Sequence, residues 1–313
     1  MKILAIVGPT GGGKSALALA LAKEYAGEII SCDSMQLYRR MDVGTAKPTQ
    51  EEQRQVTHRM IDIVEPTAPF SCADYVARAE REIADCAEQG HLPIVCGGTG
   101  LYLDALLRKN DFEPNTVSES VRKELETLGQ TCGTQALYDE LMRIDPESAA
   151  ATHPNNVKRV IRAIEIYRVS GMTKTELDRR SREGGFRYDA TVIGLRYPER
   201  EILYGRIDRR VDLMMQSGLL EETRALLAEG IFEVNQTAAQ AIGYKELLPF
   251  LYGEISLAAA VDRLKMATRR YAKRQMTWFS AKDYVRWIDM THQGVEKTFE
   301  EIVNNAKEIF QKS

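Results

Sequence analysis

The feature that most constrains the fold is a short apolar run, KILAIV, that leads directly into the glycine-rich stretch GPTGGGKS at residues 8–15. The motif G-x-x-x-x-G-K-[ST] is complete, with Gly8, Gly13, Lys14 and Ser15 in its four defining positions. Such a motif predicts a buried strand, a loop that binds phosphate and a helix that begins at the loop. The sequence therefore predicts an α/β fold from its first residues onward.

The chemistry of this loop is more general than that of a nucleotide site. Glycines let successive backbone N–H groups converge on an anion, Lys14 adds a positive charge, and the Ser15 hydroxyl can complete the shell of a Mg²⁺ ion. The following helix, KSALALALAKEY, adds the positive end of its dipole. The loop predicts phosphate and magnesium, and a nucleotide and a pyrophosphate ester fit it equally well. The alternative is a turn that serves only chain geometry.

The composition limits what the rest of the chain can bind. The 313 residues suffice for one large or two modest domains, and the formal net charge of −3 gives no general attraction to nucleic acid, so a polyanion needs a local basic patch. Five cysteines without a C-x-x-C pair and four scattered histidines indicate neither a disulfide framework nor a zinc site. No signal-peptide pattern and no run of about 18 apolar residues is present, which predicts a cytoplasmic protein with no membrane partner.

Short apolar runs alternate with helical patterns in the first hundred residues and return near the end of the chain. The predicted strands are KILAIV, EIISC (28–32), MIDIV (60–64), LPIVC (92–96), ATVIGL (190–195) and VRWI (285–288). A helix is predicted over residues 71–90, with Ser71 and Asp74 at capping-box spacing and Gly90 at its end. The pattern predicts a P-loop NTPase-like parallel sheet with helices on both faces.

Residues 114–189 have a different character, because strand-like runs give way to successive amphipathic helices. We interpret this segment as a small all-helical domain inserted into a catalytic core of residues 1–113 and 190–313. The alternative is a continuous helical half of a single domain.

Two further strand ends carry chemically useful side chains. Asp33 follows EIISC, and Thr99 follows LPIVC and two glycines. Ligands of open α/β sheets bind beyond the carboxyl ends of the strands, so these side chains are expected near the phosphate loop. Asp33 fits either a general base or a residue that orders magnesium, and spacing does not separate the two roles. Gln36 offers the donor and acceptor that an adenine edge requires.

Cationic residues occur on three predicted helices. In YGRIDRRVDLMM, Arg206 and Arg210 share a stripe, either for a ligand or for surface pairs with Asp208 and Asp212. The stretch RLKMATRRYAKRQMTWF, residues 263–279, has six cationic and no acidic residues, interleaved with aromatic side chains that can stack on unpaired bases. The faces predicted to suit a phosphate backbone are Lys265, Arg269 and Lys273 there, and Lys158, Arg159 and Arg162 in the inserted segment.

Seven stretches together resemble the bacterial tRNA dimethylallyltransferase family, also called tRNA isopentenyltransferase: GPTGGGKS, DSMQLYRRMDVGTAKP, GGTGLY, HPNNVKRVIRAIE, GLLEETRALL, QAIGYKEL and RRYAKRQMTWF. The resemblance implies transfer of a dimethylallyl group from dimethylallyl diphosphate to the exocyclic N6 amine of the adenosine at tRNA position 37, just 3′ of the anticodon, with release of diphosphate. It implies that the phosphate loop holds the prenyl donor rather than ATP. It also implies Mg²⁺, the tRNA anticodon stem-loop as partner, a monomer and no obligate protein partner.

The resemblance also implies roles for individual residues. Asp33 matches the base that accepts the amine proton, Thr99 a hydroxyl at the reaction centre, and Arg206 an arginine that reaches the diphosphate, with Lys14 as the fourth catalytic residue. Diphosphate binding is implied for Gly8, Thr10, Gly11, Gly12, Gly13, Lys14 and Ser15, with Ser15 as metal ligand. Contacts with tRNA are implied for Asp33, Ser34, Met35, Gln36, Thr99, Arg122, Lys158, Arg159, Arg162, Gln240, Gly243, Tyr244, Lys245, Arg269, Lys273 and Arg274.

Two other functions account for part of the sequence. A small-molecule P-loop kinase explains Lys14, Ser15 and Asp33 but gives the basic helices no task. An RNA-binding NTPase without catalysis explains the basic helices but not the set formed by Asp33, Thr99 and Arg206.

Overall fold

The computed structural model describes residues 1–109 and 118–312. The chain divides into two compact units, one formed by Met1–Leu107 with Tyr188–Ser313 and the other by Arg108–Arg187. The boundary expected between residues 113 and 114 lies outside the described residues.

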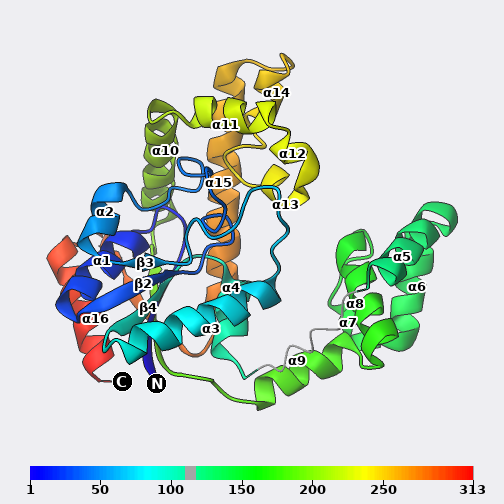
Figure 1. Cartoon of the computed structure of the whole chain (residues 1–313), viewed down its shortest axis with the longest axis horizontal. Helices are drawn as coiled ribbons and strands as arrows, with labels where there is room; N and C mark the ends of the chain where they lie inside the picture. The colour runs from blue at the N-terminus through cyan, green and yellow to red at the C-terminus, as the bar shows by residue number, and fades with distance from the viewer. Residues whose placement is uncertain (110–117, 313) are drawn as a thin grey trace. The chain divides into compact units, whose positions relative to one another are not determined.

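The first unit is built around a parallel sheet of six strands in the order β3-β2-β4-β1-β5-β6 (Figure 1). The predicted α/β class is confirmed, and β1 lies in the middle of the sheet between β4 and β5. The strands are β1 (Lys2–Val7), β2 (Gly27–Ser31), β3 (His58–Arg59), β4 (Leu92–Cys96), β5 (Asp189–Arg196) and β6 (Val285–Asp289).

Both faces of the sheet are covered, as the continuous apolar strands predict. Leu4 and Ile6 of β1 belong to a core cluster with residues of α1 (Lys14–Glu24) and α16 (Phe299–Gln311). Ile3 and Ala5 alternate with them and are equally buried, so the opposite face is also closed off from water.

The other helices of this unit surround the sheet and its carboxyl edge (Figure 1). They are α2 (Gln50–Gln55), α3 (Cys72–Glu88), α4 (Gly100–Leu107), α10 (Arg200–Gln216), α11 (Leu219–Ala228), α12 (Ile231–Val234), α13 (Gln236–Ala239), α14 (Leu248–Leu251) and α15 (Leu257–Ser280), and the hairpin strands are β7 (Thr291–His292) and β8 (Val295–Glu296). The predicted capping box of α3 is present, with the Ser71 and Asp74 side chains each bonded to the other's backbone. Among the described residues, no helix has both the length and the apolar character needed to cross a bilayer.

The prediction of a strand at MIDIV, residues 60–64, is wrong. The strand here is β3, which covers only His58–Arg59. Met60 and Asp62 have φ angles of 62° and 53°, in the left-handed region that a strand cannot use. The chain turns instead, and the Ile63 N–H donates to the Leu37 carbonyl. The apolar run at residues 60–64 therefore forms a turn instead of a strand.

The second unit is helical in its described residues and has its own apolar core. Its helices are α5 (Glu119–Cys132), α6 (Thr134–Ile144), α7 (Pro146–Ala150), α8 (Val157–Ser170) and α9 (Lys174–Glu183). Leu125, Leu137, Leu141 and Ile164 are fully buried in one cluster. Since these side chains come from α5, α6 and α8, the unit has a core independent of the sheet.

Candidate active site

The loops that follow β1, β2 and β4 leave the sheet from the same edge. Ile6 and Ser31 both lie beside Cys96 in the strand register, and all three strands are parallel. The phosphate loop, the Asp33 segment and the Thr99 segment therefore start within two strand widths of one another. This juxtaposition is the one that the strand ends predict.

The phosphate loop depends on glycine. Gly8, Gly11 and Gly13 have φ angles of 140°, 73° and 91°, which other residues rarely adopt. A Cβ on Gly8 would lie 2.7 Å from the Leu195 carbonyl oxygen. The Lys14 ammonium folds back over the loop and donates to the Pro9 carbonyl at 2.8 Å. The glycine conformations and the Lys14 contact thus fix the loop in a shape in which its backbone N–H groups and the Lys14 ammonium can bind an anion.

A cavity of about 530 Å³ opens on the outer side of this loop. Its lining carries three guanidinium groups opposite the glycines, from Arg206, Arg209 and Arg210 of α10. Arg206 donates from Nε to the Gly11 carbonyl at 3.1 Å and pairs with Glu296 of β8 at 2.7 Å. The outer cavity is therefore cationic and suited to an anion with several phosphate oxygens.

A second, inner cavity of about 80 Å³ adjoins the first one at Lys14. Lys14, Ser15 and Arg210 line both cavities, whereas Asp33 and Tyr271 line only the inner one. An anion held by the shared residues therefore has a carboxylate and a phenol on its far side.

The charges at the junction of the two cavities are poorly solvated. Burial lowers the pKa of Lys14 to about 8, opposed by the charge of Asp33 and reinforced by Arg210. Burial also lowers the pKa of Arg210 below its usual range. A bound dianion would raise the pKa of both groups, because it would add its negative charge to that of Asp33 beside the two cations.

The side chains of Asp33 and Thr99 bind neighbouring backbone N–H groups, those of Met35 and Ser34. An Asp33 carboxylate oxygen accepts from the Met35 N–H at 2.9 Å, and the Thr99 hydroxyl accepts from the Ser34 N–H at 3.1 Å. Thr99 does not line either cavity, but it interacts with the Tyr271 phenol, which does. The structure therefore brings Asp33 to the inner cavity and leaves Thr99 just behind it.

Gln275 of α15 is a site residue that sequence reasoning missed. Its amide oxygen accepts from the Thr10 N–H at 2.8 Å, and its amide nitrogen donates to the Gly98 carbonyl at 3.0 Å. A Cβ on Gly98 would lie 2.0 Å from that nitrogen, so the glycine makes room for it. The only signal was an uncharged polar residue within a basic helix, which spacing alone could not assign to a loop 265 residues away.

Gln36 is held by the chain at both ends of its amide. The Ser31 hydroxyl donates to its oxygen at 2.8 Å, and its nitrogen donates to the carbonyls of Thr45 and Ala46 at 3.3 and 3.1 Å. The donor and acceptor predicted for an adenine edge are thus engaged within the protein. Gln36 still lines the inner cavity, where it builds the wall.

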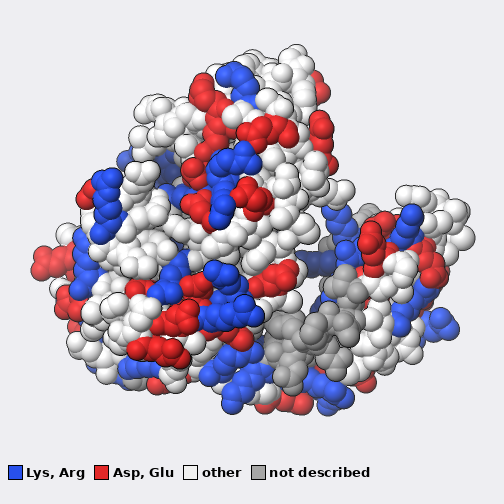
Figure 2. Space-filling view, in the orientation of Figure 1, with Lys and Arg blue, Asp and Glu red and all other residues white. Residues whose placement is uncertain are grey.

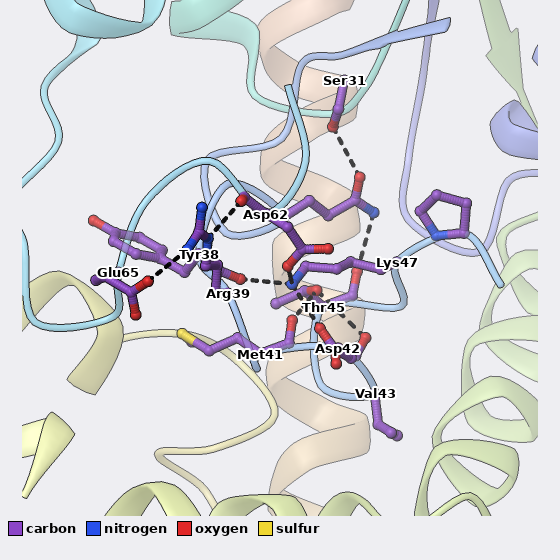
Figure 3. A network of polar contacts seen from close by, with 12 residues as sticks. Ser31, Tyr38, Arg39, Met41, Asp42, Val43, Thr45, Lys47, Asp62 and Glu65 are labelled. Carbon is purple, nitrogen blue, oxygen red and sulfur yellow. Dashed lines mark hydrogen bonds and ion pairs between the residues drawn. The ribbon is translucent and has the colours of Figure 1, made fainter. Parts of the chain in front are cut away.

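The wall continues into loop 42–48, whose shape depends on the buried side chain of Lys47. The Lys47 ammonium contacts the Tyr38 carbonyl, Asp42 and Asp62 at 2.5–2.6 Å (Figure 3). The Thr45 hydroxyl closes the turn on the Met41 carbonyl at 2.6 Å. The left-handed turn at Asp62 thus supplies a carboxylate to this loop.

The family model described as IPP transferase matches residues 36–282. The chain belongs to the IPP transferase family. It is 45% identical over 98% of its length to the tRNA dimethylallyltransferase of Caldanaerobacter subterraneus subsp. tengcongensis, covering 97% of that protein, and 47% identical over 97% to that of Halalkalibacterium halodurans, covering 96%.

Solved structures of IPP transferases share the fold. The full-length tRNA isopentenylpyrophosphate transferase from Bacillus halodurans is 43% identical, with a TM-score of 0.72 over 99% of this chain and 97% of that one. A eukaryotic dimethylallyltransferase described as acting on tRNA is 29% identical, with a TM-score of 0.83 over 99% of this chain and 80% of that one. The parallel sheet with surrounding helices is therefore the fold of the family.

Several residues expected to touch tRNA are engaged inside this IPP transferase instead. Tyr244 is fully buried, and its hydroxyl donates to Glu222 at 2.7 Å, so it cannot contact an RNA directly in this conformation. Gly243 is also buried, whereas Gln240 is exposed and Lys245 is half-buried beside Glu246. Only part of this segment therefore presents side chains to a partner.

The predicted cationic face of α15 is divided. Lys265 pairs with Asp212 at 2.6 Å and Arg269 with Asp208 at 3.0 Å. Carboxylates four residues apart on α10 thus match cations four residues apart on α15. Both cations already have a carboxylate partner, and their contact with a phosphate backbone stays a prediction. Asp208 and Asp212, the alternative surface partners of Arg206 and Arg210, are thus engaged by α15.

Other cations of α15 are exposed, and two of them lie further along the helix. Lys273 is exposed, and Arg274 is exposed with its guanidinium 5.5 Å from the ring centre of Tyr271. On the face shown in Figure 2, acidic and basic side chains are interspersed, in keeping with the net charge of −3.

In the helical unit, the predicted RNA face is likewise divided. Arg122 and Arg162 both pair with the buried carboxylate of Glu165, at 2.9 and 2.7 Å. Lys158 and Arg159 are exposed on α8. Arg122 and Arg162 neutralise a buried charge but keep side-chain exposures of 44% and 36%, so they remain accessible to a partner beside the unburied Lys158 and Arg159.

The donor set fits a magnesium ion that is completed by a phosphate ligand. The described residues contain no cluster of three or more His, Cys, Asp or Glu side chains that would hold a metal alone. Ser15 and Asp33 line the same cavity and supply a hydroxyl and a carboxylate oxygen. Mg²⁺ is usually bound by one or two such oxygens together with waters and substrate phosphates, so the set suits it.

Proposed function

We propose that this chain transfers a dimethylallyl group from dimethylallyl diphosphate to the N6 amine of adenosine 37 in tRNA, forming N6-isopentenyladenosine and releasing diphosphate. The observation that carries the proposal is that Lys14, Ser15 and Arg210 line both cavities while Asp33 lines only the inner one. An anionic leaving group held by the shared residues would then lie next to the cavity that contains the proton acceptor. Membership of the IPP transferase family and the names of the relatives support the same reaction.

The donor diphosphate would bind the phosphate loop and the α10 arginines. An allylic diphosphate leaves readily because positive charge on the prenyl carbon is delocalised, so the main task of the protein is to stabilise the departing negative charge. The loop N–H groups, Lys14 and Arg210 would do this, and Arg206 would exchange Glu296 for a phosphate oxygen. Ser15 would hold a Mg²⁺ ion together with waters and phosphate oxygens, and the ion when bound would neutralise part of the diphosphate charge.

The acceptor would enter the inner cavity. As the bond forms between N6 and the prenyl carbon, the bond from that carbon to the diphosphate oxygen breaks, and an amine proton passes to the Asp33 carboxylate. The adenine must leave the anticodon loop to reach this small space. Lys273 and Arg274, with Lys158 and Arg159 of the helical unit, would hold the surrounding RNA backbone.

We further propose that the enzyme acts as a monomer in the cytoplasm. All five cysteines are free, in keeping with a reducing compartment. A small-molecule kinase is the less favoured alternative, because the family relatives are named for transfer to tRNA.

Incubation with labelled dimethylallyl diphosphate, Mg²⁺ and unmodified tRNA tests the proposal. Label should appear in RNA at an adenosine adjacent to the anticodon. If several tRNAs stay unlabelled while ATP phosphorylates a metabolite, the kinase alternative is correct.

A further inference from the structure

Loop 42–48 forms one wall of the inner cavity and has no strand or helix of its own. Thr45, Ala46 and Pro48 line the cavity to which Asp33 also belongs. Without a backbone ladder, the position of this wall depends on side chains that bind its peptide groups. Lys47 and Gln36 hold it from within its own region, and a third set of contacts comes from far along the chain.

Glu222 of α11 binds three consecutive backbone N–H groups at the start of this loop. One carboxylate oxygen accepts from Asp42 and Val43, and the other from Gly44, all at 2.9 Å. Consecutive N–H groups that converge in this way form an anion-binding concavity, and here the anion belongs to the protein itself. The loop is therefore fixed to a helix 178 residues away in sequence.

Tyr244 completes the arrangement from the opposite side. Its hydroxyl donates to the same Glu222 oxygen that binds Gly44, at 2.7 Å. Burial, reinforced by the Glu222 charge, raises the pKa of this phenol far above its usual range, so it remains a donor at all working pH values. Its ring lies directly against Gly44, where an added Cβ would be 2.3 Å from the ring carbon Cζ. Gly44, Glu222 and Tyr244 thus fit together as one closed contact, which we name the Glu222–Tyr244 clamp.

We propose that Glu222 and Tyr244 are positioning residues for the acceptor: the Glu222–Tyr244 clamp sets where loop 42–48 stands and hence the width of the inner cavity beside Asp33. The inference rests on the proposed function and names residues that act on the acceptor side of that site without touching the reacting groups.

The clamp has a direct route to the cavity and no direct contact with the donor loop. Gln36 binds the carbonyls of Thr45 and Ala46, so a shift of the loop moves a side chain that lines the cavity. The phosphate loop is held by other partners, since Thr10 binds Gln275 and Lys14 binds Pro9. Loss of the clamp should therefore impair use of the RNA and leave diphosphate binding intact.

Four variants of the full chain test this inference. Tyr244→Phe removes only the hydroxyl, and Glu222→Gln replaces an acceptor with an amide that cannot accept all three N–H groups. The matched controls are Glu221→Gln, an exposed neighbour on the same turn of α11, and Tyr252→Phe, an exposed tyrosine. The measurements are steady-state transfer of labelled dimethylallyl groups at varied tRNA, calorimetric binding of inorganic pyrophosphate with Mg²⁺, and thermal unfolding.

We expect kcat/KM for tRNA to fall about tenfold in Tyr244→Phe and roughly 10- to 100-fold in Glu222→Gln, since small misplacements at a reacting centre have effects of this size. The Kd for pyrophosphate should stay within about twofold of the wild-type value in both clamp variants, because the clamp does not contact the donor loop. For the two control variants, kcat/KM and Kd should both stay within about twofold of wild type.

Three results would contradict these assignments. If the clamp variants unfold at a lower temperature but keep kcat/KM for tRNA, the clamp is purely structural. If they lose pyrophosphate affinity as much as kcat/KM for tRNA, the clamp does not act selectively on the acceptor side. Either result overturns the inference while the wild type still transfers label. A wild type that transfers no label overturns the proposed function itself.

Discussion

The phosphate loop and loop 42–48 line the same inner cavity, but they are held in place in different ways. The phosphate loop lies between β1 and α1, and its shape follows from glycines and backbone N–H groups within eight consecutive residues. Loop 42–48 is held by side chains, namely Lys47, Gln36 and the distant Glu222. The backbone shape of the donor loop is therefore encoded mainly by its own glycines, although Gln275 and Arg206 add contacts from distant segments. Loop 42–48 depends on side-chain contacts for its position, and Glu222 makes the most distant of them.

The largest effect is expected where the two sides meet, at Asp33. Asp33→Asn keeps an oxygen for the Met35 N–H but removes the base, so transfer should fall by about 10²- to 10⁴-fold. Binding of pyrophosphate with Mg²⁺ should change little, since Lys14, Arg210 and the loop remain. Single-turnover transfer and calorimetry measure the two quantities. Near-normal transfer in this variant would remove Asp33 from the role of base, and a large loss of pyrophosphate affinity would make it chiefly a metal ligand.

The next largest effects are expected from glycine substitutions, which should affect different activities in the two loops. Gly44→Ala forces a Cβ into the Tyr244 ring, so kcat/KM for tRNA should fall by roughly 10- to 100-fold while pyrophosphate still binds. Gly205→Ala is the control, because a Cβ there meets nothing within 4 Å and the residue lies inside α10. Replacement of Gly8, whose Cβ would meet the Leu195 carbonyl, should instead weaken pyrophosphate binding. Equal losses of both activities in the Gly8 and Gly44 variants would end the distinction between the two sides.

A smaller effect is expected from pH, and it belongs to the donor side alone. The pKa of Lys14 is about 8 in the free protein, so its ammonium loses its charge as the pH rises through that value. Because kcat/KM reports the free enzyme, kcat/KM for dimethylallyl diphosphate should fall above pH 8. Bound diphosphate favours the charged ammonium, so kcat should fall only at higher pH. In Lys14→Ala, the pH profile of kcat/KM should lack the inflection near pH 8. If the inflection persists in that variant, it arises from another group.

The contrast between the loops also explains what the sequence could predict. Gly8, Lys14 and Ser15 were identifiable because the whole loop is written in consecutive residues, and Asp33 because it follows a buried strand. Gln275 and Glu222 were not identifiable, since each acts on a peptide group more than 170 residues away. Tyr244 was assigned to RNA from family resemblance, whereas the structure shows it buried against Gly44. The expected strand at residues 60–64 failed because left-handed φ angles at Met60 and Asp62 depend on packing and on Lys47 rather than on apolar character.

The smallest effect concerns α15, where paired and exposed cations alternate along one helix. Changing Lys273 and Arg274 to Ala removes two exposed charges, so the slope of log K against log salt for tRNA binding should become shallower by about 1–2. The matched change of Lys265 and Arg269 to Ala removes the same charge from residues that pair with Asp212 and Asp208. That variant should leave the slope nearly unchanged and lower stability by about 1 kcal/mol at most for each half-exposed pair. Filter binding at several salt concentrations measures the two slopes. If the slopes are equal, RNA binding breaks the ion pairs of Lys265 and Arg269 with α10, and these two cations also contact the RNA.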